Sequence, residues 1–185
     1  MVATVLLAAL LAHPTAFRID PAAAEAGFDL KATMHTVHGV TKRVSGEIHA
    51  ELEGDGGLRI TGRIEIDAAT LVTGNDKRDA TMHGKSLLVP SFPSIVFSPA
   101  HFSTSGAAAD GAPVSGTLTG QLTIRGKTRS QSMAVTLTPQ GGRISVAGTF
   151  DVTWADFGIP DPSFFVVRIE DRAHAHFRAE FVPLP

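Results

Sequence analysis

The chain has 185 residues, which is enough for one domain with a sizeable core and too few for two ordinary ones. Its formal net charge is −2 and no stretch gathers lysine and arginine into a basic face, which argues against a nucleic-acid partner. Cysteine is absent, and this excludes disulfides, thiol catalysis and zinc sites built on cysteine.

The N-terminus begins with an apolar run, residues 2–12, followed by small residues. The run is too short to cross a bilayer, which takes roughly 20 residues, and it has the length of the apolar region of a secretory signal peptide. No lysine or arginine precedes it, and a buried N-terminal helix is the alternative. We expect residues 1–16 to be a signal peptide or its remnant, residues 17–185 to form the folded domain, and the protein to be periplasmic or secreted.

From residue 17 onward, apolar and polar residues alternate with the period of two that is typical of half-buried strands. The shared apolar faces comprise Phe28, Leu30, Ala32 and Met34; Leu58, Ile60, Ile64 and Ile66; Leu118, Leu122 and Ile124; Met133, Val135 and Leu137; Ile144, Val146, Phe150, Val152 and Trp154; and Ala173, Ala175, Phe177, Ala179 and Phe181. Helical periodicity is weak except over residues 76–89. The pattern predicts an all-β, antiparallel fold with a short helix near residues 76–89.

Glycine recurs on the apolar side of four expected strands, at Gly46, Gly62, Gly120 and Gly148. Glycine inside a strand marks a bend or the close approach of another group. A sheet that curls into a barrel needs such bends, and a barrel of about eight strands can hold a small ligand. The glycines therefore favour a barrel. They leave open whether they provide curvature alone or curvature together with internal space.

Candidates for catalysis or metal binding are weak. There is no G-x-S-x-G motif, and His174 and His176 together give only two of the ligands that zinc needs. His35 and His38 would point to opposite sides of an extended segment. The acids available for a catalytic pair lie at strand ends or in loops, where acids commonly cap turns; they are Asp67, Asp76, Asp79, Asp156 and Asp161. We expect no catalytic residue, no metal and no cofactor.

Five segments in order over nearly the whole of residues 17–182 resemble the YceI-like family of periplasmic, lipocalin-like lipid-binding proteins. The segments are FRIDPAAAEAGFDL, VSGEI, IEIDAATLVTGNDKRDATMHGKSLLVPSFPSIVF, GTLTGQLTIRGKTRSQSMAVTL and FDVTWADFGI. The chain departs from the family pattern at Ala23, Ala24, Thr81, Ser86, Leu87 and Leu88, where polar or aromatic residues are usual. These departures leave the binding of an apolar tail intact and remove the basis for naming a head group.

The resemblance implies an extended, antiparallel, eight-stranded barrel that encloses an elongated apolar cavity for polyisoprenoid chains. Its ligand-binding residues would be Phe28, Leu30, Ile48, Ile64, Leu87, Leu88, Phe92, Ile95, Phe97, Leu118, Leu122, Ile124, Phe150 and Trp154. The charged segment that precedes the leucine pair would form either a head-group contact or a structural corner, through Arg78, Asp79 and His83. In the structural case, Arg78 and Asp79 are a hydrogen-bonded pair or separate anchors for the turn.

The implied function is the non-enzymatic binding, sequestration or transport of a long-chain lipid, such as an isoprenoid quinone, a fatty acid or a fatty amide. We also expect transient contact with a membrane, and either a monomer or a homodimer. Two alternatives remain at this point. One is a metal-dependent or acid–base enzyme that uses residues such as Asp79 and His83 at the barrel mouth. The other is a stress-associated structural module whose barrel is filled.

Overall fold

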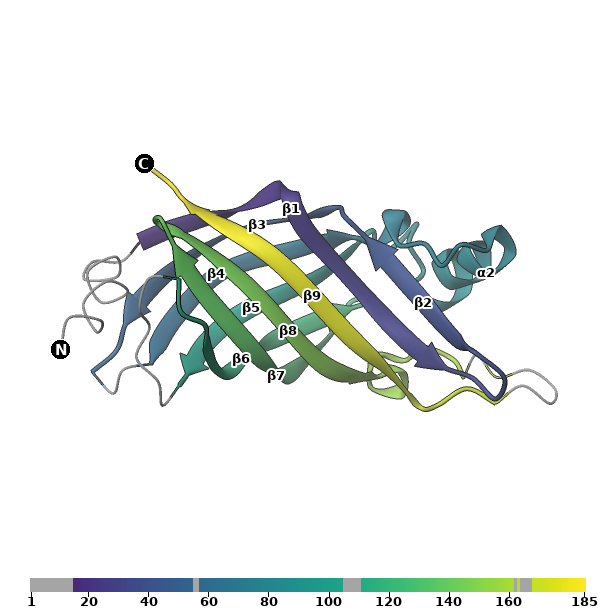
Figure 1. Ribbon diagram of the computed structural model, residues 1–185. Coiled ribbons are helices and arrows are strands. Elements are labelled where there is room, and N and C mark those ends of the chain that lie inside the picture. Colours follow the sequence, from purple (N-terminus) through teal and green to yellow (C-terminus); the bar gives the residue numbers. More distant parts are fainter. Residues whose placement is uncertain (1–14, 55–56, 105–110, 162, 164–167) are drawn as a thin grey trace.

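The computed structural model describes residues 15–54, 57–104, 111–161, 163 and 168–185. Within these ranges nine strands form one antiparallel sheet in the order β2-β1-β3-β4-β5-β6-β7-β8-β9, and β1 also pairs with β9. The sheet therefore closes into a barrel (Figure 1). Eight strands form the closed ring, because β2 pairs beside one half of β1 only. The expected all-β barrel is confirmed.

The strands are β1 Thr15–Lys31, β2 Thr36–Thr41, β3 Val44–Leu52, β4 Leu58–Asp67, β5 Ser94–Ser103, β6 Val114–Ile124, β7 Lys127–Gln140, β8 Arg143–Thr153 and β9 Arg172–Pro183. The helical segments are η1 Ala68–Thr70, α2 Asp76–Thr81, η2 Met82–Ser86 and η3 Trp154–Phe157. The short helix expected over residues 76–89 is thus confirmed as α2 and its continuation η2. The side chain of Asn75 caps α2 by accepting a hydrogen bond of 3.0 Å from the Arg78 N–H.

The expected signal peptide lies almost entirely outside the described residues, and β1 begins at Thr15. At its other end, β1 stops at Lys31, so the predicted continuation of its apolar face to Met34 is wrong. Met34 lies in the turn between β1 and β2 and is 87% exposed. The alternation of apolar and polar residues continues through the turn by coincidence. Alternation alone does not indicate the residue at which the hydrogen bonding of a strand ends.

Strand β1 is bent, and the bend lengthens the barrel at one end. Its first residues, Thr15–Arg18, pair with β3, whereas Ala26–Lys31 pair with β2. The register against β9 shifts between Ile19 and Ala24, where Pro21 lies. Proline has no N–H to give to a ladder and is tolerated at such an irregularity. Strand β2 therefore continues the wall toward the end of the barrel that carries α2 (Figure 1).

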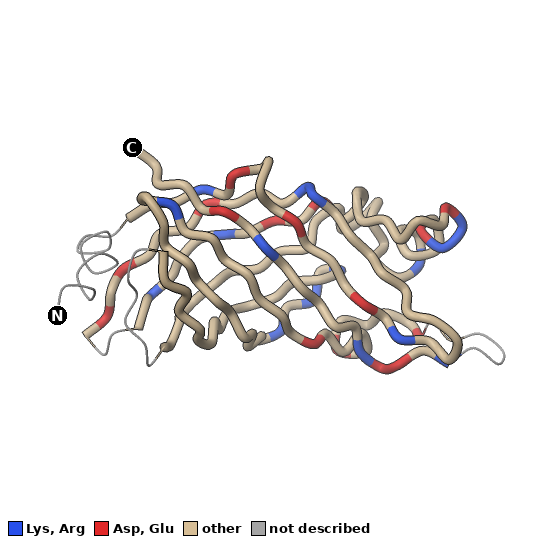
Figure 2. The backbone as a smooth tube through the Cα atoms, viewed as in Figure 1, with Lys and Arg blue, Asp and Glu red and all other residues tan. Residues whose placement is uncertain are grey.

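Acidic and basic residues are scattered along the backbone, and neither sign forms an extended patch in this view (Figure 2). Ion pairs between neighbouring strands include Arg143–Glu180 at 2.5 Å and Arg178–Glu25 at 3.1 Å. Three charged residues, Glu25, Arg78 and Arg178, also border the interior of the barrel, and most of the other residues around it are apolar.

One hydrogen bond on the outer surface gives a pH-dependent prediction. The Ser94 hydroxyl donates to the Glu65 carboxylate, and this bond lowers the pKa of Glu65 below its usual value. A lowered carboxyl pKa adds stability above the unfolded-state pKa, and this stability is lost as the pH falls through the folded-state pKa. We expect Ser94→Ala to be less stable than the wild type at about pH 7 and to converge with it near pH 3.

Urea denaturation at these two pH values measures the effect, and Ser98→Ala on the same strand is the control. A stability difference that persists at the lower pH would contradict the assignment, because it would then arise from packing rather than from the carboxylate.

Candidate ligand cavity

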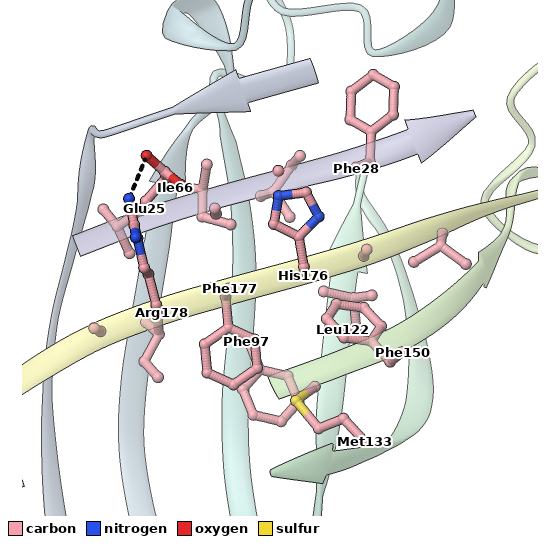
Figure 3. A pocket seen from close by; sticks show the side chains of 18 of the residues that line it. Glu25, Phe28, Ile66, Phe97, Leu122, Met133, Phe150, His176, Phe177 and Arg178 are labelled. Atoms are coloured by element: carbon pink, nitrogen blue, oxygen red, sulfur yellow. Dashed lines mark hydrogen bonds and ion pairs between the residues drawn. The ribbon is translucent and has the colours of Figure 1, made fainter. Parts of the chain in front are cut away.

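The interior of the barrel contains a cavity of about 490 Å³, within the range of small-molecule binding sites. Its wall draws on the strands of the barrel and on residues 71–87 beside α2. The lining is almost entirely apolar, and Figure 3 shows Phe97, Leu122, Met133, Phe150 and Phe177 around it. A cavity with such walls offers burial to an apolar chain and few hydrogen-bonding partners.

The cavity is lined along the whole barrel, and the side chains around it pack less tightly in the half nearer α2. Along β9, Phe181 is buried while Phe177, further toward the α2 end, is only partly buried. Along β1, Phe17 is fully buried at 0% exposed, whereas the inward-facing Phe28 is not. The end of the cavity near the start of β1 is therefore closed by packed side chains, which include Phe102 at 1% exposed.

Alanines line the wall where β1 meets β9, at Ala26, Ala175 and Ala179. Ala175 pairs with Phe28 on one side and with Phe150 on the other. Between two phenylalanines, this short side chain leaves space in the cavity.

Phenyl rings and glycines together set the width of the cavity. A Cβ atom placed on Gly148 would lie 2.5 Å from Cε1 of Phe177, and one placed on Gly120 would clash with the Ser98 carbonyl oxygen and lie 2.6 Å from Cζ of Phe97. Each ring therefore lies against the wall in the place that a larger residue would occupy. Gly62 has a different role, because its φ of 132° and its close approach to the Glu47 carbonyl belong to the curvature of β3 and β4. The glycines thus provide both curvature and space.

Nearly all the residues expected to bind ligand line this cavity; the two that do not are Leu88 and Phe92. Leu88 has a φ of 51° in the tight turn after η2, and the Phe92 ring packs against Gly126. A turn directs both side chains away from the cavity, and the spacing of apolar residues in the sequence does not predict this. Sequence reasoning did not nominate Phe177 or Met133, although both lie on apolar faces that the alternation had identified.

The charged corner beside α2 is organised around Thr73. Buried Asp79 accepts hydrogen bonds from the Thr73 N–H at 2.9 Å and from its hydroxyl at 2.5 Å. The Arg78 guanidinium donates to Thr73 Oγ1 at 2.7 Å and to the Thr73 carbonyl at 2.9 Å. Arg78 and Asp79 are therefore separate anchors of one turn. His83 donates to the Leu71 carbonyl at 2.7 Å, and of the three charged candidates only Arg78 lines the cavity.

Four of the remaining polar residues lie around a second, shallower pocket, namely Asp29, Asp151, His174 and His176. His174 lies 2.6 Å from Asp151, and His38 lies 2.6 Å from Asp29. In the part of the chain that the structure describes, no three histidine or acidic side chains are grouped as metal ligands. The expected capping role of the acids is confirmed at Asp67, which accepts a hydrogen bond of 3.0 Å from the N–H two residues later.

A scan against protein-family models matches the YceI-like domain over residues 17–181. The chain belongs to the YceI-like family. Among solved structures, BcnA of Burkholderia cenocepacia aligns with a TM-score of 0.69 at 18% identity, covering 88% of this chain and 98% of that one. A polyisoprenoid binding domain from Saccharophagus degradans, implicated in plant cell wall breakdown, aligns with a TM-score of 0.71 at 14% identity, covering 92% and 99%.

The YceI protein of Campylobacter jejuni aligns with a TM-score of 0.61 at 16% identity, covering 83% of this chain and 88% of that one. At these identities the likeness shows the shared fold of the YceI-like barrel. A search of curated proteins found no significant match. No helix within the described ranges has both the length and the apolar character to cross a bilayer.

Proposed function

We propose that this YceI-like protein binds a long apolar amphiphile of the polyisoprenoid class inside its barrel and catalyses no reaction. The observation that carries the proposal is the apolar cavity of about 490 Å³ inside the barrel. The description of a neighbouring structure as a polyisoprenoid binding domain supports it. Polyprenols and isoprenoid quinones are the ligands we favour, and fatty acids or amides have tails of similar chemistry.

The driving force is the transfer of the tail out of water. Each buried CH₂ contributes about 0.8 kcal/mol, so ten of them contribute about 8 kcal/mol before the cost of ordering the chain is subtracted. The wall is mostly apolar, and its polar residues on the strands are Glu25 on β1 and His176 and Arg178 on β9. Specificity for the tail then rests on length and shape.

The polar end of the ligand belongs at the α2 end of the cavity. Thr73, Arg78 and Ser86 line the cavity there. The guanidinium has five N–H donors, and its contacts with Thr73 engage two of its nitrogens. Arg78 therefore stabilises the turn first and offers its remaining donors to a carbonyl, carboxylate or hydroxyl group of the ligand.

We also propose that the protein acts outside the cytoplasm, in the periplasm or after secretion, as a carrier or a store of its lipid. The apolar run at residues 2–12 supports export. A carrier of this kind shields a tail from water while the lipid is away from a membrane, which fits a closed barrel with an apolar interior.

The test is to purify the protein from a lipid-containing host and to record its mass under native conditions, followed by solvent extraction of the bound material. We expect a species heavier than the apoprotein that loses its extra mass on extraction. Prenyl quinones and fatty amides are then added to the extracted protein. If only the apoprotein mass is recorded before extraction, and neither lipid class binds afterwards, the proposal is wrong.

A further inference from the structure

The dimensions of the cavity set a limit on the ligand. We infer, on the basis of the proposed function, that the barrel selects its lipid by chain length and that its cavity is matched to a tail of about 20 carbons, or about four isoprene units. Longer prenyl chains then gain nothing from their additional units, because those units stay outside the barrel.

The length follows from the volume. An apolar cavity of about 150 Å³ holds one benzene molecule, which has six carbons. At the same volume per carbon, the cavity of about 490 Å³ holds roughly 20 carbons. A tail of this size fills the space at the packing density of a protein interior, whereas a shorter tail leaves part of the wall without contacts.

The end of the cavity away from α2 is closed by packed side chains. Phe17, Phe102 and Phe181 line the cavity there, and each is at most 4% exposed. Leu58 and Ile144 also line this end, opposite Phe102 and Phe181 on the neighbouring strands. A tail that enters from the α2 end therefore stops at this layer, because the close packing of these side chains leaves no room beyond them.

The rings of Phe97 and Phe177 set the width of the space before this layer. Each ring lies over a glycine, Gly120 or Gly148, and both side chains point into the cavity in Figure 3. A methyl group on Gly148 has Cε1 and Cζ of Phe177 as its nearest contacts, at 2.5 and 2.8 Å, and the Ala134 carbonyl at 3.0 Å. Gly148→Ala should therefore displace the Phe177 ring into the space that the tail occupies.

A competition experiment tests the inference. The extracted protein is incubated with an equimolar mixture of farnesol, geranylgeraniol and solanesol in detergent micelles, and native mass spectrometry reads which prenol is bound. Geranylgeraniol has one isoprene unit more than farnesol, and solanesol has more than twice as many units as geranylgeraniol. We expect geranylgeraniol to exceed farnesol by about tenfold or more and solanesol to show no gain over geranylgeraniol.

The outcomes separate the two proposals. If solanesol dominates by tenfold or more, the length limit is wrong and the proposed function stands. If no prenol, quinone or fatty amide binds, the proposed function fails and the length limit fails with it.

Gly148→Ala adds a test of the wall, with its fold checked by circular dichroism and thermal unfolding. We expect this variant to shift the preference from geranylgeraniol toward farnesol by about tenfold. The matched control is Gly54→Ala, because a Cβ at Gly54 would meet no atom within 4 Å. A folded Gly148→Ala protein with the wild-type preference would contradict the role of the Phe177 ring in setting the limit.

Discussion

Replacing Ala175 with phenylalanine should weaken lipid binding by about a hundredfold and leave the barrel folded. Ala175 lines the cavity between Phe28 and Phe150 on the neighbouring strands. A third ring in this row projects into empty space, so the new side chain fills the cavity without displacing the core. Displacing three or four methylenes of a bound tail removes about 3 kcal/mol, which weakens binding by about a hundredfold.

Titration of the variant with a fluorescent fatty acid measures this loss, and thermal unfolding checks the fold. The matched control is Ala147→Phe, which adds the same ring to the exposed face of the adjacent strand β8. We expect the control to bind like the wild type. Undiminished binding by Ala175→Phe would show that the ligand lies elsewhere, because Ala175 lines the proposed site.

Replacing Asp79 with alanine should destabilise the protein by about 2–3 kcal/mol, because a buried carboxylate then no longer accepts two hydrogen bonds from Thr73. The Thr73 N–H and hydroxyl would be left without this acceptor in a partly buried turn. The control is Asp76→Ala, which removes an exposed acid from the same helix and should cost about 0.5 kcal/mol or less. Urea unfolding of both variants gives the comparison.

Arg78→Ala distinguishes a structural corner from a head-group site. We expect a loss of about 1–2 kcal/mol of stability from the missing bonds to Thr73, with little change in the ranking of lipids that differ only in the tail. An altered ranking of lipids with different head groups, at unchanged stability, would instead assign Arg78 mainly to ligand recognition.

Much of the barrel was predictable from period-two alternation alone. Inward-facing residues such as Leu118, Leu122 and Phe150 could be assigned to a face because a strand turns its side chains to opposite sides at every step. The helix near residues 76–89 was predictable from its change of pattern. By contrast, Leu88 and Phe92 lie on a turn, where side-chain direction depends on individual φ and ψ angles rather than on a repeat.

The charged corner illustrates the limit for polar residues. The concentration of charge around Arg78 and Asp79 singled out the right segment, and both a pair and separate anchors were open. Both side chains lie on α2, and both hydrogen-bond to Thr73 in the loop before the helix rather than to each other. The spacing of these residues in the sequence does not predict their shared contact with Thr73, because that contact depends on the path of the loop between Leu71 and α2.

The class of fold, the faces of the strands and the family could be read from the amino-acid sequence, because each of these depends on local alternation or on motifs in order along the chain. The cavity, and its closure by packed side chains at one end, emerged only from the folded barrel. Free volume is the difference between a closed wall and the side chains that enter it from strands distant in sequence. Two glycines show this most clearly. Gly62 allows the backbone to bend, whereas Gly148 makes room for the Phe177 ring, and this second role exists only because β9 pairs with β8.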